Sequence, residues 1–417
     1  MNDPINKNRR KMLMVGAAAS SLGIIGAAYS LKRGIRYPTL GLEPKPLPTQ
    51  FLSSNNQTKL TSNDLIRLTD RPDTSFALRA FSPEPSITIE NREKTRLFLS
   101  INNVPLDAEL TSNNSVRSIK ETRNGINREI EIDLNTNESV NLQWRLPFSN
   151  DFSFASIGDS GGDKELAWCI ERAHQLGAKF FLHLGDFNYQ AGDYKRSVEL
   201  FRNSPIPCYI SIGNHDFHEN GSIYPQFLSE LGPLNHAFTI GKTRFANLDT
   251  AANVFPYSSG KRGKLISKLI HENQLVADTV AYTHRPLHDP LEDSSHDIGS
   301  IGERDWLIDA LNQINCNTLL SGHIHIYHRS NFKGIDNIIA GQGLGHQDLL
   351  TKSDYSKMVV GHVERDGRVS YTTAPLSMPF ELHCHPRSQS ARDTLLTTEP
   401  KGLGVEISKR IEATCQI

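Results

Sequence analysis

Five short apolar runs in the middle of the chain each end on a polar residue, and this repeated pattern constrains the fold more than any other feature. The runs are FSFASIGD, KFFLHLGD, PCYISIGN, TVAYTH and NTLLSGH. Short runs rich in β-branched and aromatic residues are typical of buried strands. Apolar residues at helical spacing occur over 164–176, 194–201, 265–271 and 304–314. Strands that alternate with helices predict an α/β layer structure.

A different pattern comes before this region. Short apolar runs alternate with turn residues and show no helical period, which predicts a small all-β sandwich. After the five runs, the sequence predicts further strands over 326–375 and one short helix over 405–411. The expected boundaries are a Pro-rich linker over 36–54, the β-sandwich over 55–149, the α/β domain over 150–378 and a C-terminal tail over 379–417.

The first 35 residues have the outline of an export signal. Arg9 and Arg10 precede an apolar stretch over 12–29 that is rich in Ala and Gly, and the paired arginines resemble a twin-arginine signal. The alternative is a single membrane anchor, although the Ala, Gly and Ser content weakens insertion. We therefore expect the twin-arginine export machinery as a partner. The expected location is periplasmic or extracellular, with anchoring by an uncleaved segment as the alternative.

Composition excludes two classes of protein. The chain has 45 basic and 46 acidic residues, so no excess of positive charge indicates a nucleic-acid partner. Five cysteines in 417 residues are too few, and odd in number, for a scaffold built on disulfides.

The first three strand ends carry oxygen ligands at regular intervals. Asp159, Asp186 and Asn214 lie 27 and 28 positions apart, which is about one strand–helix unit. Because the carboxyl ends of parallel strands meet at one edge of a sheet, three loops are expected to converge there.

The last two strand ends carry histidines. His284 follows one run, and His323 and His325 follow the other, where side chains two positions apart on extended backbone share a face. Carboxylate, carboxamide and imidazole groups are ligands for borderline or hard metals. The set is large enough for two ions, with a carboxylate as the bridge between them.

As a set, these blocks resemble the ordered motifs of the calcineurin-like metallophosphoesterases: GDSGG (158–162), GDFNY (185–189), GNHD (213–216), YTH (282–284) and GHIH (322–325). Many members begin with Asp-x-His, but the third position here is Gly161. The purple acid phosphatase branch has Gly at this place and a Tyr three residues after the second Asp, as Tyr189 is here. The resemblance implies an α/β fold with a four-layer β-sandwich flanked by helices, preceded by a small all-β sandwich that looks like a fibronectin-like domain.

The resemblance also implies two metal sites and an activity. The first ion would be bound by Asp159, Asp186, Tyr189 and His325. A phenolate is a hard donor that suits trivalent iron. The second ion, divalent zinc, manganese or iron, would be bound by Asp186, Asn214, His284 and His323. The implied activity is metal-dependent hydrolysis of small phosphate monoesters, as in acid phosphatases.

Further residues are candidates for proton transfer. His215 is expected to hydrogen-bond the phosphate or protonate the leaving alkoxide, and the alternative is that it supports Asn214. Asp216 is expected to orient His215. The resemblance also implies a second acid after the YTH block, where His288 and His296 both qualify by residue type and His296 is the preferred candidate.

Arg285 and a glycine run lie near the predicted ligands in the sequence, and two other functions are compatible with the same residues. Arg285 either clamps the phosphate or forms an exposed salt bridge, and the glycine run over 341–345 is expected to be a turn near the site. One alternative function is a phosphodiesterase that acts on nucleotides or lipid head groups, because the same centre cleaves diesters when its pocket admits two substituents. The other is a non-catalytic protein that binds a surface through its β-sandwich; the retention of all seven ligand positions argues against it.

Overall fold

The computed structural model describes residues 47–53, 56–68, 76–112, 118–217, 224–251, 260–272, 275–291, 296, 298, 301–344 and 356–376, and the backbone alone of 380–386 and 394–400. The expected export signal over 1–35 and the expected helix over 405–411 lie outside the described residues. Among the described residues, no helix has the length and apolar character needed to cross a membrane.

Ten strands form the N-terminal β-sandwich: β1 (Gln50–Leu52), β2 (Thr58–Thr61), β3 (Leu65–Arg67), β4 (Phe76–Ala80), β5 (Ser86–Asn91), β6 (Thr95–Asn102), β7 (Glu109–Ser112), β8 (Ile119–Asn124), β9 (Asn127–Leu134) and β10 (Glu138–Arg145). They make two sheets with the orders β1-β2-β5-β10-β7 and β3-β4-β6-β9-β8. Alternate residues of β5 and β9 are buried, as expected for strands with one face on a core. The predicted all-β region is confirmed, although β1 lies within the range expected to be linker.

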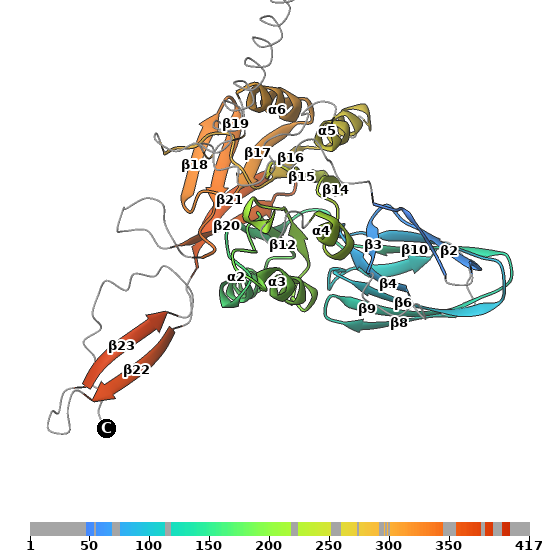
Figure 1. Ribbon diagram of the computed structural model, residues 1–417. Coiled ribbons are helices and arrows are strands. Elements are labelled where there is room, and N and C mark those ends of the chain that lie inside the picture. The colour runs from blue at the N-terminus through green and yellow to red at the C-terminus, as the bar shows by residue number, and fades with distance from the viewer. Residues whose placement is uncertain are drawn as a thin grey trace, which may run out of the picture.

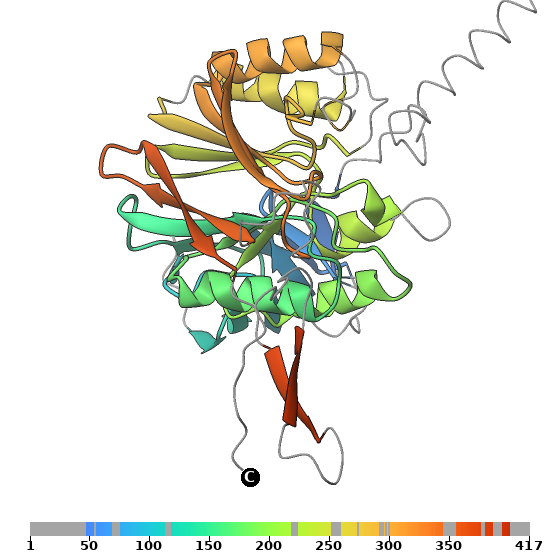
Figure 2. The ribbon, with the colours of Figure 1, turned by 90° about the vertical axis from the view of Figure 1, so that its left-hand side faces the viewer.

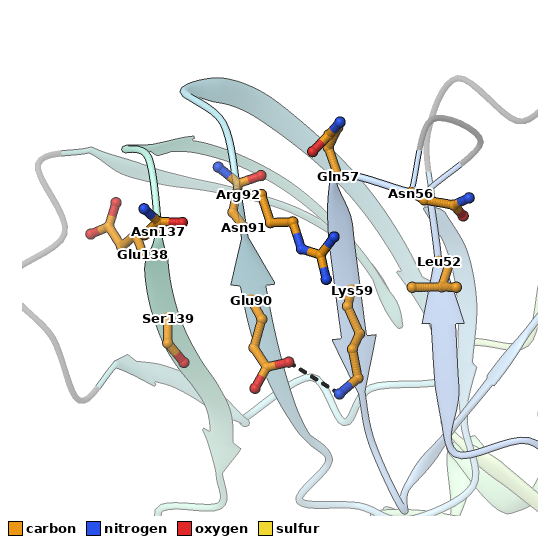
Figure 3. A pocket seen from close by; sticks show the side chains of 10 residues that line it. All are labelled: Leu52, Asn56, Gln57, Lys59, Glu90, Asn91, Arg92, Asn137, Glu138 and Ser139. Carbon is orange, nitrogen blue, oxygen red and sulfur yellow. Dashed lines mark ion pairs between the residues drawn. The ribbon is translucent and has the colours of Figure 1, made fainter.

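A polar pocket of about 310 Å³ lies along β1, β2, β5 and β10 of this sandwich (Figure 3). Lys59 and Glu90 form an ion pair of 3.1 Å at its wall, and Arg92 and Glu138 add further charge. No candidate site residue lines it, so this pocket belongs to the sandwich and not to the predicted metal centre.

The first sheet of the α/β domain contains β11 (Phe152–Ile157), β12 (Phe181–His183), β13 (Cys208–Ile210), β20 (Lys357–Val363) and β21 (Val369–Pro375), in the order β13-β12-β11-β20-β21. The strands β11, β12 and β13 are parallel. The helices α2 (Lys164–Gln175) and α3 (Asp193–Arg202) connect them, within a few residues of the predicted bounds. A third helix, α4 (Tyr224–Glu230), follows β13 and was not predicted.

The second sheet contains β14 (His236–Ile240), β15 (Thr243–Asn247), β16 (Asp278–Tyr282), β17 (Cys316–Ser321), β18 (Tyr327–Phe332) and β19 (Ile335–Ala340), in the order β14-β15-β16-β17-β19-β18. The helices α5 (Lys261–Glu272) and α6 (Ile301–Gln313) pack on its outer face. The central strands β15, β16, β17 and β19 are parallel.

The two sheets pack face to face between two layers of helices, as Figures 1 and 2 show. Phe154 and Leu182 from the first sheet share one core with Phe245, Val280 and other residues of the second. The outer face of the first sheet packs against α2 and α3, and that of the second packs against α5 and α6. The predicted four-layer α/β architecture is therefore confirmed.

The tail differs from its expectation. An antiparallel hairpin of β22 (Phe380–Pro386) and β23 (Thr394–Pro400) occupies the region expected to be a tail, and it stands apart from the α/β domain in Figures 1 and 2. Apolar and polar residues alternate over 380–386, which is a strand signal that the expectation of a tail did not take into account.

Candidate metal centre

The strand ends bring the predicted ligands to one edge of both sheets. Asp159, Asp186 and Asn214 follow the parallel strands β11, β12 and β13, while His284 and His323 follow β16 and β17. The backbones of Asp159, Asp186 and His323 adopt positive φ angles of 60°, 60° and 69°. Non-glycine residues in this region are uncommon and occur preferentially at functional sites.

Three predicted metal ligands, Asp159, Asp186 and His325, converge around the hydroxyl group of the fourth, Tyr189. Its Oη lies 3.4 Å from Asp159 Oδ1, 3.3 Å from Asp186 Oδ2 and 3.3 Å from His325 Nε2. The single hydroxyl proton can be donated to only one of these groups at a time, and the two carboxylates repel each other when both are ionised. Burial and the charges of Asp186 and Asp159 raise the pKa of Tyr189 well above its usual value. A cation at this point would relieve the repulsion and favour the phenolate, so the residues fit a metal ion.

A second set of donors surrounds His284. Its Nδ1 donates a hydrogen bond of 2.9 Å to the backbone oxygen of Leu184, which leaves the lone pair on Nε2. This Nε2 lies 2.8 Å from Asn214 Oδ1, 3.4 Å from Asp186 Oδ2 and 3.1 Å from His323 Nδ1. One ligand atom each from Asp186, His284 and His323 lies within 4.8 Å of the others. These atoms also fit a metal ion, and Asp186 belongs to both sets.

Arg285 takes part in the second set through His323. Its Nη1 donates a hydrogen bond of 2.8 Å to His323 Nε2, so Nδ1 carries the ring proton when no metal is bound. Burial and the charge of Arg285 lower the pKa of His323 well below its usual value, which keeps the ring neutral. Arg285 is only 1% exposed, and the expectation of an exposed salt bridge is wrong. Metal binding at His323 Nδ1 therefore requires the release of a proton.

The carboxylate of Asp216 fixes the loops that carry Asp186 and Asn214. Its Oδ2 accepts hydrogen bonds from the backbone N–H groups of Gly213 and Asp186, at 2.6 and 3.0 Å, and its Oδ1 accepts one of 2.9 Å from Phe187. These contacts hold backbone amides together, whereas the sequence had suggested that Asp216 orients the His215 ring. A Cβ atom at Gly213 would overlap the carboxylate of Asp186, so the glycine is required for this close approach.

Burial alone would raise the pKa of Asp186, but two neighbours reverse this effect. The imidazole of His284 in its protonated form, and the backbone N–H of His215, which donates a hydrogen bond of 2.8 Å to Asp186 Oδ1, lower the pKa below its usual value. The carboxylate is therefore ionised and available as a ligand at neutral pH.

Two buried residues that the sequence had not identified support the same loops. Asp193 Oδ2 accepts hydrogen bonds from the backbone N–H groups of Tyr189 (3.0 Å) and Gln190 (2.8 Å). His183 Nδ1 accepts a hydrogen bond from the backbone N–H of Gly185, and its Nε2 donates a hydrogen bond of 2.8 Å to Ser160 Oγ. Burial lowers the pKa of His183 to about 3, so the ring stays neutral. An acidic residue at the start of a predicted helix was the one available signal, for Asp193.

The glycine run was expected to be a turn near the site, and its described part packs on the first block. The backbone N–H of Gly343 donates a hydrogen bond of 2.9 Å to the backbone oxygen of Gly158. That of Leu344 donates one of 2.7 Å to the backbone oxygen of Asp159. These bonds fix the backbone on either side of the Asp159 carboxylate.

The candidate acids lie at different distances from the donors. The His215 ring packs against Tyr189 with a centroid separation of 4.6 Å. The ring centroids of His296 and His323 are 5.2 Å apart, and the backbone N–H of His296 donates a hydrogen bond of 3.0 Å to Asp289 Oδ2. His288 is exposed and stacks on Phe332 at 4.9 Å. The structure thus brings His215 and His296 to the donor sets, while the contact of His288 is with β18.

The sequence profile of the calcineurin-like phosphoesterases matches residues 152–327, which contain both donor sets. No curated protein sequence matches the chain significantly. Similar solved structures include a purple acid phosphatase from yellow lupin (Lupinus luteus), with 12% identity, a TM-score of 0.45 and coverage of 70% of each chain. They also include GAP50 of the inner membrane complex of Plasmodium, with 16% identity, a TM-score of 0.42 and coverage of 54% of this chain and 85% of that one.

A third similar structure is PhoD, with 12% identity, a TM-score of 0.40 and coverage of 86% of this chain and 92% of that one. All three TM-scores are below 0.5, so the identification depends on the profile match and on the motifs at the strand ends. Residues 152–327 of the chain, which hold both donor sets, thus match the calcineurin-like phosphoesterase family.

Proposed function

We propose that the chain hydrolyses phosphate monoesters at a two-metal centre of the purple acid phosphatase type. The observation that carries this proposal is the convergence of Asp159, Asp186 and His325 on the hydroxyl of Tyr189, at 3.3–3.4 Å. Tyrosine replaces the histidine that many family members have in the first block. An anionic phenolate with two carboxylates suits a trivalent ion better than a divalent one.

The first site would hold Fe³⁺ with Asp159, Asp186, Tyr189 and His325. The second would hold zinc, manganese or ferrous iron with Asp186, Asn214, His284 and His323. When bound, such a pair of ions supplies Lewis acidity that polarises a phosphoryl oxygen and activates water. The trivalent ion should lower the pKa of that water further, so we expect an activity optimum on the acid side.

The chain's own residues would orient the ester and move protons. His215 packs on Tyr189, and its backbone is fixed to Asp186, so its ring has a defined place beside the centre. We assign to it the protonation of the leaving alkoxide or a hydrogen bond to the phosphate. His296, in contact with His323, is the candidate for the second acid. Asp216 would act by fixing the backbone of the GDFNY and GNHD blocks to each other.

The experiment is elemental analysis of the purified full-length protein, followed by assays on p-nitrophenyl phosphate and on bis(p-nitrophenyl) phosphate. We expect about one iron ion per chain, a second divalent ion and faster hydrolysis of the monoester. Faster hydrolysis of the bis ester would favour a phosphodiesterase for nucleotides or lipid head groups. A protein that holds both metals and hydrolyses neither ester would instead support a non-catalytic binding role.

We also propose that residues 1–35 direct export through the twin-arginine machinery, to the periplasm or the cell exterior. The sequence supports this through Arg9, Arg10 and the apolar stretch that follows them. This route is expected to move folded proteins, so metals could be inserted before export. Changing both arginines to lysine should retain the protein in the cytoplasm; normal export of that variant would contradict the proposal.

A further inference from the structure

The edge of the first sheet lies against the N-terminal β-sandwich. In that sheet β13 is the edge strand, and it leads within four residues from Ile210 to Asn214. An edge strand has backbone N–H and C=O groups that no neighbouring strand satisfies. The position of Asn214 and His215 therefore depends on what holds the outer side of β13.

Asn103 of the sandwich takes the place of a neighbouring strand. Its Oδ1 accepts a hydrogen bond of 2.9 Å from the backbone N–H of Cys208, and its Nδ2 donates one of 3.1 Å to the oxygen of the same residue. The same Nδ2 also lies 2.8 Å from the oxygen of Ala80 within the sandwich. Asn103 is completely buried, and its φ of 70° is a conformation that asparagine tolerates better than most residues.

The next outward carbonyl of β13 is bound from the second sheet. Asn247 Nδ2 donates a hydrogen bond of 3.0 Å to the oxygen of Ile210, and its Oδ1 accepts one of 2.6 Å from Ser211 Oγ. Two asparagine side chains, one from the sandwich and one from β15, thus fix successive outward groups of this strand.

Arg79 of β4 joins the two ends of the same segment. Its guanidinium donates to the oxygen of Cys208 at 3.2 Å and to the oxygen of Leu231, next to the end of α4, at 3.4 Å. The residues between these two oxygens include Asn214 and His215. Arg79 is completely buried, and burial lowers its pKa to about 10, so it remains charged at neutral pH.

Asn102 extends the contact to the helix after the Tyr189 loop. Its Oδ1 accepts a hydrogen bond of 2.6 Å from Arg79, and its Nδ2 donates one of 2.9 Å to the oxygen of Arg202, the last residue of α3. Figure 1 shows β3 and β4 of the sandwich beside α4. The sandwich thus binds the ends of α3 and α4 and the start of β13.

We propose that Asn103 and Arg79 are positioning residues for the Asn214–His215 loop, so that the β-sandwich is a working part of the metal centre and not a separate binding module. This inference rests on the proposed function, because the loop it positions carries a proposed metal ligand and a proposed acid. Loss of either side chain should loosen β13 and α4 and let Asn214 move away from His284.

The test compares Asn103→Gly and Arg79→Lys with two matched controls in the full-length protein. Glycine accepts the positive φ of position 103, so only the side-chain contacts are lost. Asn137→Gly makes the same change at an exposed asparagine with a φ of 57° in the sandwich. Arg128→Lys changes a completely buried arginine that binds the oxygens of Pro105 and Gly125 within the sandwich.

Three readouts separate positioning from general stability: amide hydrogen exchange over 208–216, the Kd for Mn²⁺ and the kcat for p-nitrophenyl phosphate. We expect exchange to be about threefold to tenfold faster and the Kd for Mn²⁺ to be about tenfold weaker in Asn103→Gly and Arg79→Lys. A fall in kcat with little change in KM should accompany these effects, and both controls should behave as the wild type.

Unchanged exchange and unchanged Mn²⁺ affinity in both test variants would overturn the inference. Equal effects in the controls would overturn it too, because they would indicate a loss of stability in the sandwich as a whole. If Asn103→Gly does not fold, Arg79→Lys decides the outcome. If exchange and Mn²⁺ affinity change as expected but the wild type hydrolyses no phosphoester, the positioning role stands and the proposed function fails.

Discussion

The hydroxyl of Tyr189 lies 3.3 Å from Nε2 of His325, although 136 positions separate the two residues in the chain. One follows a strand of the first sheet and the other follows a strand of the second, so this pair forms only when the two sheets pack together. The proposed iron site therefore depends on the packing of the two sheets. A substitution that disturbs either sheet should also disturb the iron site.

Replacing Tyr189 with phenylalanine removes the phenol oxygen and keeps the ring that packs on His215. We expect loss of trivalent iron and of the visible absorption band that a phenolate gives with it. Loss of a supporting partner costs about 10–100-fold in metal affinity, and loss of a direct ligand should cost at least as much. Iron analysis and a visible spectrum check this; unchanged metal content and colour would rule out the trivalent site.

His296 and His288 can be separated by parallel substitution with alanine. A general acid contributes about 10²–10⁴-fold to rate, so His296→Ala should lower kcat on an ester with a poor leaving group by a factor in that range. His288→Ala should have a rate near that of the wild type, because this side chain is exposed and stacks on Phe332. The reverse order of effects would transfer the role to His288.

Asp216→Asn should weaken both the fold and the centre. Both carboxylate oxygens accept backbone N–H groups, and an amide in this place must direct its NH₂ group at one of these donors. A buried donor without an acceptor costs about 1–3 kcal/mol. We expect this loss in the free energy of unfolding, measured in urea, and a lower affinity for Mn²⁺. A variant with wild-type stability would contradict the backbone-fixing role.

Asp193→Ala should release the loop that carries Tyr189, because its carboxylate accepts the N–H groups of Tyr189 and Gln190. We expect less bound iron per chain with little change in Mn²⁺ affinity at the second site. Asp163→Ala is a suitable control, since Asp163 precedes α2 without a side-chain capping bond. Equal iron loss in both variants would indicate a general effect of the substitution.

His236 should make the protein less stable in acid. Burial lowers the pKa of this ring from 6.5 to about 4. The folded state holds the neutral form, so this stability is fully present above pH 6.5 and is lost as the pH falls towards 4. Between pH 7 and pH 5 the loss should be about 2 kcal/mol in the free energy of unfolding. His236→Gln should reduce this dependence, whereas the same change at the exposed His271 should not.

The ligand positions could be predicted because each is attached to the end of an apolar strand. Asp159, Asp186 and Asn214 follow such runs at intervals of one strand–helix unit, so their convergence follows from parallel pairing. The helix α4 was missed because its seven residues are too few to show a period. His288 and His296 could not be separated by sequence, because the loop that carries them has no repeating pattern.

The contacts that support the ligands could not be predicted at all. Asn103 binds Cys208 across 105 positions of sequence, and a side chain that binds backbone groups needs no particular residue type at the other end. Asp216 was identified from its place in the GNHD block, but nothing in that block indicates that two of its partners are amides of another loop. Such contacts depend on how the two domains and the two sheets meet.

The hydrogen bond from His284 to the backbone oxygen of Leu184 determines which imidazole nitrogen is left free to bind a cation. Because the acceptor is a main-chain atom, this choice depends on the contact between the end of β12 and the end of β16. Substitution of the side chain at position 184 cannot abolish it as long as the strand keeps its path. The path of the backbone therefore determines which nitrogen of His284 can bind a cation. A comparison of side chains alone would not reveal this dependence.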